Sequence, residues 1–267
     1  MNIQELRKSP HLSASSIGDY VECGLRYKFG RIDHIKPEYT SDALVFGSTI
    51  HKVLEMFYSG KMEGVKLSVT DVLNHFEEQW KKSAEGNSSI KYKDGKSFES
   101  IMSEGKSLIE TYYQNLPEDD FQVLAIEEPF SFSITGVDVP FIGVIDLIES
   151  DESGETIIIS DFKTSSKAYS TAEIEKNLQL TLYQLAAKAN GYRDREILLR
   201  FDCLIKTKVT KFAQYYTVRS EADERKAVKL IQTACDGIQK GVFIPNTNSW
   251  KCNLCEFKTN CNEWFDN

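Results

Sequence analysis

Charged residues of complementary chemistry lie within two apolar, β-branched segments of the chain. Asp146 follows Gly143 in the run FIGVIDLI, and Asp161 and Lys163 end the run TIIISDFK. Carboxylates on neighbouring strands can hold a divalent cation, and an ammonium group beside that ion can stabilise negative charge that develops on a substrate. These residue types therefore predict a metal-dependent phosphodiesterase, provided that the fold brings them together.

A β-hairpin is the element that must position these residues. Ser153 and Gly154 are a reverse-turn signal between the two segments, and a loop there sets Asp146 opposite Asp161. Because side chains alternate along a strand, Asp161 and Lys163 should project from the same face. Opposed carboxylates destabilise a sheet unless a cation lies between them, so this register favours a metal site over solvated charges at strand ends.

The pattern Gly143-x-x-Asp146 followed by Asp161-Phe162-Lys163 resembles the PD-(D/E)XK nuclease superfamily. Segments described next narrow the resemblance, which covers most of the chain, to RecB-like exonucleases with an iron–sulfur cluster, including those encoded at CRISPR loci and by phages. It implies a DNA exonuclease that uses Mg²⁺ or Mn²⁺ on single-stranded DNA or DNA ends. The residues implied to bind metal or act in catalysis are Asp146, Asp161, the backbone carbonyl of Phe162, and Lys163.

Two predicted helices extend this resemblance. The segment GSTIH, which ends at His51 in a predicted helix over 42–58, is similar to the family's G-x-x-x-H segment. A histidine on a helix is usually structural, so the role of His51 as a metal ligand is implied by the resemblance alone. Gln179 and Tyr183, which share one face of a predicted helix over 174–190, are similar to the family's Q-x-x-x-Y element. In that element they position the lysine or the DNA strand.

Four cysteines form a second candidate site. Cys252, Cys255 and Cys261 are close together in the sequence, and Cys23 is distant from them. Four thiolates can bind zinc or an iron–sulfur cluster. One distant cysteine with three clustered ones is similar to the family's 4Fe–4S clasp, whereas zinc ribbons commonly use two close pairs. We therefore expect a mainly structural 4Fe–4S cluster, with Zn²⁺ as the alternative.

Apolar residues near each cysteine in the sequence indicate how far that thiol is shielded from solvent. We expect Trp250, Phe257 and Trp264 to form an apolar shell that limits solvent access to the four-cysteine site. Cys203 lies in a predicted strand and Cys235 in a predicted helix, each among apolar residues. These two are expected to be buried and inert.

The order of predicted elements gives an α/β fold, with a mixed central sheet flanked by helices as in restriction endonucleases. We interpret residues 1–267 as a single nuclease domain. Its helical part is about 1–118 and its nuclease core about 119–220. The C-terminal helix and the cysteine clasp are about 221–267, completed by Cys23.

Composition is that of a soluble globular protein, with 41% apolar and 27% charged residues and a net charge of −8. No apolar run is long enough to span a membrane and no signal peptide is recognised, so a cytoplasmic location is expected. A local basic groove can still coexist with an acidic chain. The candidate DNA contacts are Arg26, Lys206, Lys208 and Lys211, although lysines at a hairpin tip often serve solubility alone.

Two other functional readings stay open. The chain could be a catalytically idle DNA-binding or assembly subunit that keeps the cysteine site as a scaffold, or a zinc-ribbon adaptor. The nuclease is favoured over both, because an inactive copy need not keep the complete set of site residues, His51, Asp146, Asp161 and Lys163. DNA is the expected partner, and the resemblance adds proteins of CRISPR adaptation, recombination or repair.

Overall fold

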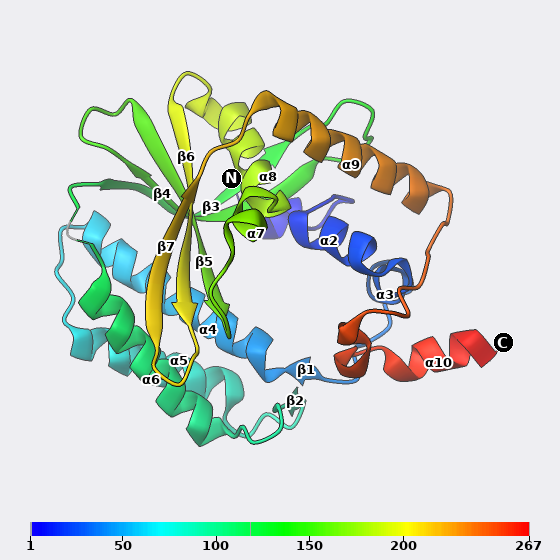
Figure 1. The fold of residues 1–267 in the computed structure, drawn as a ribbon, viewed down its shortest axis with the longest axis horizontal. Coiled ribbons are helices and arrows are strands. Elements are labelled where there is room, and N and C mark those ends of the chain that lie inside the picture. The colour runs from blue at the N-terminus through cyan, green and yellow to red at the C-terminus, as the bar shows by residue number, and fades with distance from the viewer. Residues whose placement is uncertain (1, 118, 267) are drawn as a thin grey trace.

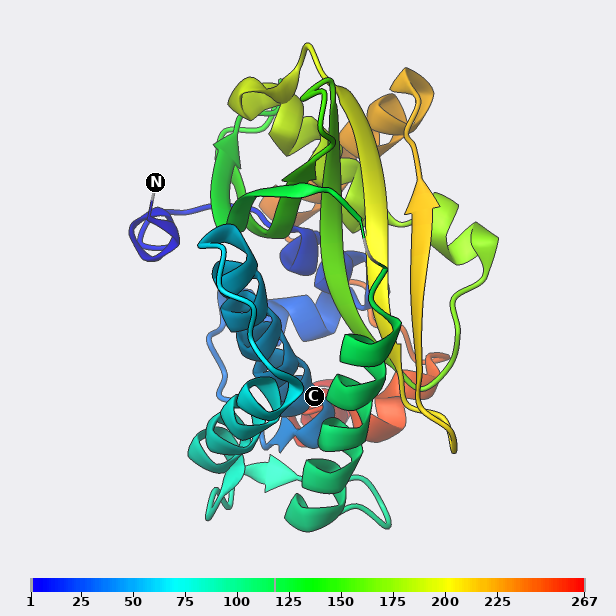
Figure 2. The same ribbon diagram turned by 90° about the vertical axis from the view of Figure 1, so that its left-hand side faces the viewer.

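A five-stranded mixed sheet forms the centre of the computed structural model, which describes residues 2–117 and 119–266. β5 and β6 pair in parallel, and the other neighbouring strands are antiparallel. Helices lie on both faces of the sheet (Figure 1, Figure 2), so the predicted α/β architecture is confirmed. In spatial order, the strands are β3 Gln122–Phe132, β4 Phe141–Ser150, β5 Thr156–Ser165, β6 Glu196–Ile205 and β7 Lys211–Thr217.

Serine residues begin most of the longer helices. Ser68, for example, accepts a hydrogen bond from the backbone N–H of Asp71 at 3.2 Å, which satisfies a donor that the first helical turn leaves free. Within the described residues, no helix is long and apolar enough to cross a membrane. The α-helices are α1 Ile3–Leu6, α2 Ala14–Glu22, α3 Gly24–Tyr27, α4 Asp42–Met62, α5 Val69–Ala84, α6 Phe98–Asn115, α7 Thr171–Glu175, α8 Leu178–Ala187, α9 Glu221–Gln239 and α10 Lys258–Asp266.

Two apolar cores lie on opposite faces of the sheet. On one face α4, α5 and α6 pack against Phe162 through large side chains at helical spacing, such as Phe76 and Trp80 of α5. On the other face α2, α8 and α9 cover Ile159. Alternation along β5 therefore places Asp161 on the face of α8, on the same side as Ile159.

The hairpin of β4 and β5 has the predicted register. Leu147 pairs with Ser160 and Ile148 with Ile159, and the same alignment sets Asp146 level with Asp161. The turn closes with a hydrogen bond from the Gly154 N–H to the Asp151 carbonyl at 3.2 Å. Gly154 has a φ of 72°, a left-handed conformation that glycine adopts without steric cost.

The predicted helix over 174–190 is wrong, because the structure divides it. α7 ends at Glu175, and α8 begins only at Leu178. Between them Asn177 caps α8, and its side-chain oxygen accepts a hydrogen bond from the Leu180 N–H at 3.1 Å. Asparagine competes for backbone hydrogen bonds in this way and therefore favours helix starts over helix interiors.

A small parallel pairing links two segments that the sequence left without strands. β1 (Thr40–Ser41) pairs with β2 (Ile90–Lys91). β1 leads directly into α4, and β2 lies in the lysine-rich segment over 85–96. The pairing fixes this segment beside the N-terminus of α4, at the bottom of the molecule in Figure 1.

Candidate functional site

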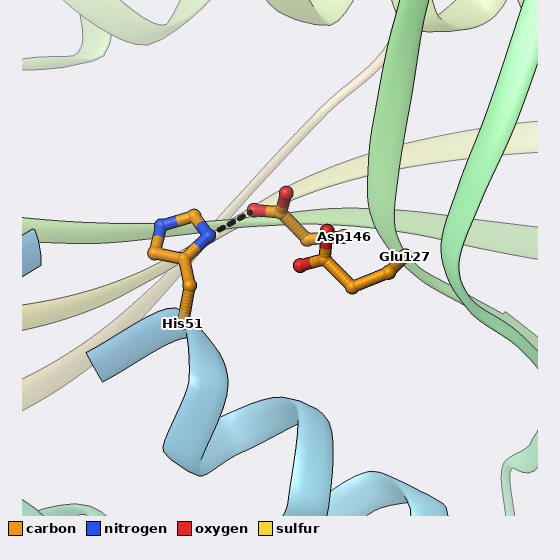
Figure 3. A group of neighbouring side chains, drawn as sticks. All are labelled: His51, Glu127 and Asp146. Carbon is orange, nitrogen blue, oxygen red and sulfur yellow. Dashed lines mark ion pairs between the residues drawn. The ribbon is translucent and has the colours of Figure 1, made fainter. Parts of the chain in front are cut away.

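Three side chains from separate elements converge beside the sheet (Figure 3). His51 comes from α4, Glu127 from β3 and Asp146 from β4, and one ligand atom of each lies within 4.8 Å of the others. In residues 2–117 and 119–266, no other group of three or more His, Cys, Asp or Glu side chains meets this spacing. An imidazole nitrogen with carboxylate oxygens suits Mn²⁺ or Mg²⁺, so these residues fit a divalent cation.

Glu127 is the site residue that the sequence did not reveal. The pairing between β3 and β4 shifts between Val123 and Ala125, and beyond this shift Glu127 is level with Asp146. The φ of Glu127 is 48°, in the left-handed region that a non-glycine residue rarely adopts. The acidic pair Glu127-Glu128 inside a predicted strand was the available signal, but the strand pattern alone does not say which acid faces inward.

The His51 ring is held between the two strands of the hairpin. Its Nε2 lies 2.9 Å from the carbonyl oxygen of Phe162, and its Nδ1 lies 3.5 Å from Oδ2 of Asp146. With the proton on Nε2, the ring donates to the carbonyl and turns the Nδ1 lone pair toward the carboxylates. Metal-binding histidines are commonly oriented by such a hydrogen bond from the other nitrogen. The Phe162 carbonyl thus orients His51 here, and its predicted role as a direct ligand stays a prediction.

Negative charge is concentrated and poorly solvated at this group. Burial, and then the neighbouring Asp161, raise the pKa of Asp146 well above its usual range, although a 2.8 Å hydrogen bond from the Phe162 N–H opposes the shift. Burial, followed by the charge of Asp146, raises the pKa of Glu127 from 4.5 to about 7. A bound cation would stabilise the ionised form of both carboxylates.

Asp161, Lys163, Gln179 and Tyr183 form a closed ring of polar contacts beside the group of His51, Glu127 and Asp146. Lys163 Nζ lies 2.6 Å from Asp161 Oδ2 and donates a 2.8 Å hydrogen bond to Gln179 Oε1. Gln179 Nε2 donates to the Tyr183 hydroxyl at 2.8 Å. That hydroxyl donates to Asp161 Oδ1 at 3.1 Å and completes the ring. The structure therefore brings together the four residues expected at the end of β5 and on α8.

The ring keeps Lys163 charged and fixed in direction. Burial disfavours the ammonium form, but the carboxylates of Asp161 and Asp146 outweigh it, so the pKa of Lys163 lies above its ordinary value. Asp161 is itself buried, and both of its oxygens are engaged within the ring. Asp161 lies outside the group formed by His51, Glu127 and Asp146, and its coordination of metal stays a prediction.

Three of the four candidate cysteines gather where α3 packs against the C-terminal segment. Cys23, Cys255 and Cys261 pack in a small apolar cluster around Phe257. Burial raises the pKa of the Cys261 thiol, and the nearby Cys23 and Cys252 add to the shift. The segment over 250–266 that carries three of these cysteines lies next to α3 in Figure 1.

Only one of the three predicted shielding aromatics is buried. Phe257 is 4% exposed, whereas Trp250 and Trp264 are 73% and 45% exposed. The predicted shell is therefore wrong for both tryptophans, because neither the short 3₁₀ helix Trp250–Leu254 nor α10 buries a residue of its own. Cys203 and Cys235 are buried as expected, and burial raises the pKa of Cys203 to about 12.

The candidate DNA contacts occupy two different environments. Arg26 forms ion pairs with Asp19 and with Glu256, the latter at 2.7 Å, so its guanidinium ties the N-terminal helices to the clasp. These contacts indicate a structural role for Arg26. Lys206 and Lys208 lie in the β6–β7 hairpin. The backbone N–H of Lys206 donates a 2.7 Å hydrogen bond to the carbonyl of Ser165.

Comparisons with known proteins identify the family of this chain. The sequence model of the PD-(D/E)XK nuclease superfamily matches residues 11–262. A solved structure from Eubacterium rectale named "Putative exonuclease" covers 91% of this chain and 87% of its own, with a TM-score of 0.55 and 10% identity. Another, named SSO0001, covers 97% and 95% with 15% identity, but its TM-score of 0.33 is too low to indicate a shared fold. No curated protein matches the sequence. Since the family model spans nearly the whole chain, this protein belongs to the PD-(D/E)XK nuclease superfamily.

Proposed function

We propose that this protein hydrolyses phosphodiester bonds of DNA with a divalent cation held by His51, Glu127 and Asp146. The observation that carries the proposal is the meeting of this metal-binding group with the Asp161–Lys163 ion pair in a member of a nuclease superfamily. When bound, Mg²⁺ or Mn²⁺ would polarise the scissile phosphate and lower the pKa of a water molecule.

The remaining side chains have roles that follow from their contacts. The Lys163 ammonium stabilises charge that develops on the phosphate and orients the attacking water. Gln179 holds the ammonium through its 2.8 Å hydrogen bond, and Tyr183 holds the Asp161 carboxylate that pairs with it. We further propose that Asp161 and the Phe162 carbonyl complete the coordination when the cation and DNA are both present.

We propose exonuclease action on single-stranded DNA or DNA ends. The sequence resemblance to RecB-like exonucleases supports this action and this substrate. The name "Putative exonuclease" of the Eubacterium rectale protein that shares the fold supports the exonuclease action alone. The same resemblance supports a role in CRISPR adaptation, recombination or repair. A cytoplasmic location accords with that setting.

We propose that Cys23, Cys252, Cys255 and Cys261 hold a 4Fe–4S cluster of mainly structural function. The proposal is supported by the packing of Cys23, Cys255 and Cys261 in one apolar cluster around Phe257, and by the sequence resemblance to iron–sulfur exonucleases. An anaerobic preparation should be brown with visible absorption, and a colourless, zinc-containing one would overturn this assignment.

The experiment that tests the function is a nuclease assay on matched linear and circular single-stranded DNA. Linear DNA labelled at either end should lose its label with Mn²⁺ or Mg²⁺, circular DNA should survive, and a chelator should stop the reaction. Asp161→Ala should remove the activity. Cleavage that persists in the Asp161→Ala variant would contradict the site, and binding without any cleavage by the wild type would favour the idle DNA-binding subunit.

A further inference from the structure

A group of lysines lies beside the N-terminus of α4 and the C-terminal end of β5, two elements that carry site residues. Lys93 and Lys96 come from the segment that carries β2, and Lys206 comes from the β6–β7 hairpin. We call these three residues the lysine patch. Lys208 extends it along the hairpin tip, where it is exposed.

Both segments of the patch are anchored to elements that carry site residues. The Lys93 N–H donates to Oδ2 of Asp42, the first residue of α4, at 3.0 Å. The Lys206 N–H donates to the carbonyl of Ser165, the last residue of β5, at 2.7 Å. The patch therefore has a fixed position relative to His51 on α4 and to β5, the strand that carries Asp161 and Lys163.

The lysine patch borders the helix that carries His51. The Lys206 ammonium is 4.8 Å from the ring centre of Phe46 on α4. Phe46 precedes His51 by five residues, which is about 7.5 Å along the helix axis, so the two residues lie within about a turn and a half of each other on α4.

The charge of the patch is incompletely balanced within the protein. Burial lowers the pKa of Lys206. The negative charges of Glu104 and Asp42 oppose this shift, whereas the positive charges of Lys96 and Lys93 add to it. Both opposing acids are already engaged: Glu104 pairs with Lys96, and Asp42 accepts hydrogen bonds from the backbone. Over residues 2–117 and 119–266, neither Lys93 nor Lys206 forms an ion pair with a carboxylate.

We propose that the lysine patch binds the sugar–phosphate backbone of the nucleic-acid strand outside the cleavage site. This inference rests on the proposed nuclease function and adds the path of the substrate to it. Ammonium groups that lie close together without carboxylate partners repel each other, and phosphates placed among them remove that repulsion. Contacts of this kind are independent of base sequence, and each one makes binding weaken as salt rises.

The test uses metal-free protein and a fluorescent oligonucleotide, so that binding is measured apart from hydrolysis. The variants are Lys93→Gln with Lys206→Gln, and Lys93→Gln with Lys208→Gln in case the half-buried Lys206 is needed for folding. The control is Lys66→Gln with Lys229→Gln. These two lysines also lack ion pairs among the described residues, and they lie beyond the far end of α4 and on α9. Single-stranded and duplex arms show which form of DNA follows the patch.

Each patch variant should bind the oligonucleotide roughly tenfold more weakly than the wild type, and the control should bind as the wild type does. For a single strand, the slope of log affinity against log salt should fall by about 0.7 for each phosphate-binding lysine that is replaced. Equal affinities and slopes in wild type, patch variants and control would overturn the proposal. If the wild type shows this binding but cleaves no DNA, the nuclease function fails while the patch stands.

Discussion

Glu127 lies level with Asp146 across β3 and β4, and its backbone adopts a φ of 48° in that position. Such a conformation costs on the order of 1–3 kcal/mol for a non-glycine residue. In this strained conformation, Glu127 places a second carboxylate beside His51. β3 is thereby the third element, after α4 and β4, that contributes to the site. Functional sites often keep strain of this kind, and a bound cation would offset it.

The first prediction concerns Glu127 as a metal ligand. Glu127→Gln should weaken Mn²⁺ binding by roughly tenfold or more, a change of about 1.4 kcal/mol or greater, because the amide lacks the charge that attracts the ion. Glu128→Gln is the matched control, since Glu128 is the next residue but is exposed. Calorimetric titration measures both, and equal losses in the two variants would exclude a specific role for Glu127.

The second prediction is a pH dependence of the metal-free protein. The pKa of Glu127 is raised from 4.5 to about 7, so between these values the folded protein keeps a proton that the unfolded chain has lost. Stability should therefore fall as pH rises through this window, and the neutral Glu127→Gln variant should escape that fall. Thermal melts should favour the variant at pH 8 and show a smaller difference at pH 5. Saturating Mn²⁺ should remove the variant's advantage.

The third prediction concerns Lys163. Lys163→Ala should lower kcat by on the order of 10²–10³-fold, because the charge that stabilises the developing phosphate charge is lost. Mn²⁺ binding should change little, since Lys163 supplies no metal ligand. Lys167→Ala serves as control, because this exposed lysine in the following loop forms its ion pair with Glu173 and its backbone hydrogen bonds with Ser165. A variant that keeps wild-type kcat would show that Lys163 has no part in the reaction.

Local signals account for what the sequence predicted well. The opposition of Asp146 and Asp161 followed from one turn signal at Ser153-Gly154, because a short loop fixes the register of a hairpin. The starts of α5 and α6 likewise follow from serine caps, Ser68 and Ser97, directly before each helix. In both cases the residues that decide the structure are neighbours in the sequence.

The features that the sequence did not predict depend on distant contacts. Glu127 faces the site only because the β3–β4 register shifts and its φ is positive, and neither event has a local sequence signal. Trp250 and Trp264 were expected to shield the cysteines because they are aromatic. Both are exposed because the C-terminal elements that carry them, the 3₁₀ helix Trp250–Leu254 and α10, bury no residue of their own.

The fourth prediction concerns the cysteine site. Cys261→Ala should remove visible absorption from an anaerobic preparation and lower the melting temperature, by roughly 2–4 °C for each kcal/mol of stability that is lost. The reason is that the clasp joins residues near opposite ends of the chain. Cys235→Ala is the control, because this buried thiol lies on α9 outside the cluster. An unchanged melting temperature with abolished cleavage would contradict a mainly structural cluster.

The most direct test of the account is Mn²⁺ binding to wild-type protein and to the variant His51→Ala with Asp146→Asn, followed by electron paramagnetic resonance of free Mn²⁺. Circular dichroism checks that the variant is folded. The account predicts stoichiometric binding by the wild type and at least a tenfold weaker affinity in the folded variant. Equal binding by the two proteins would contradict a cation site formed by α4, β3 and β4.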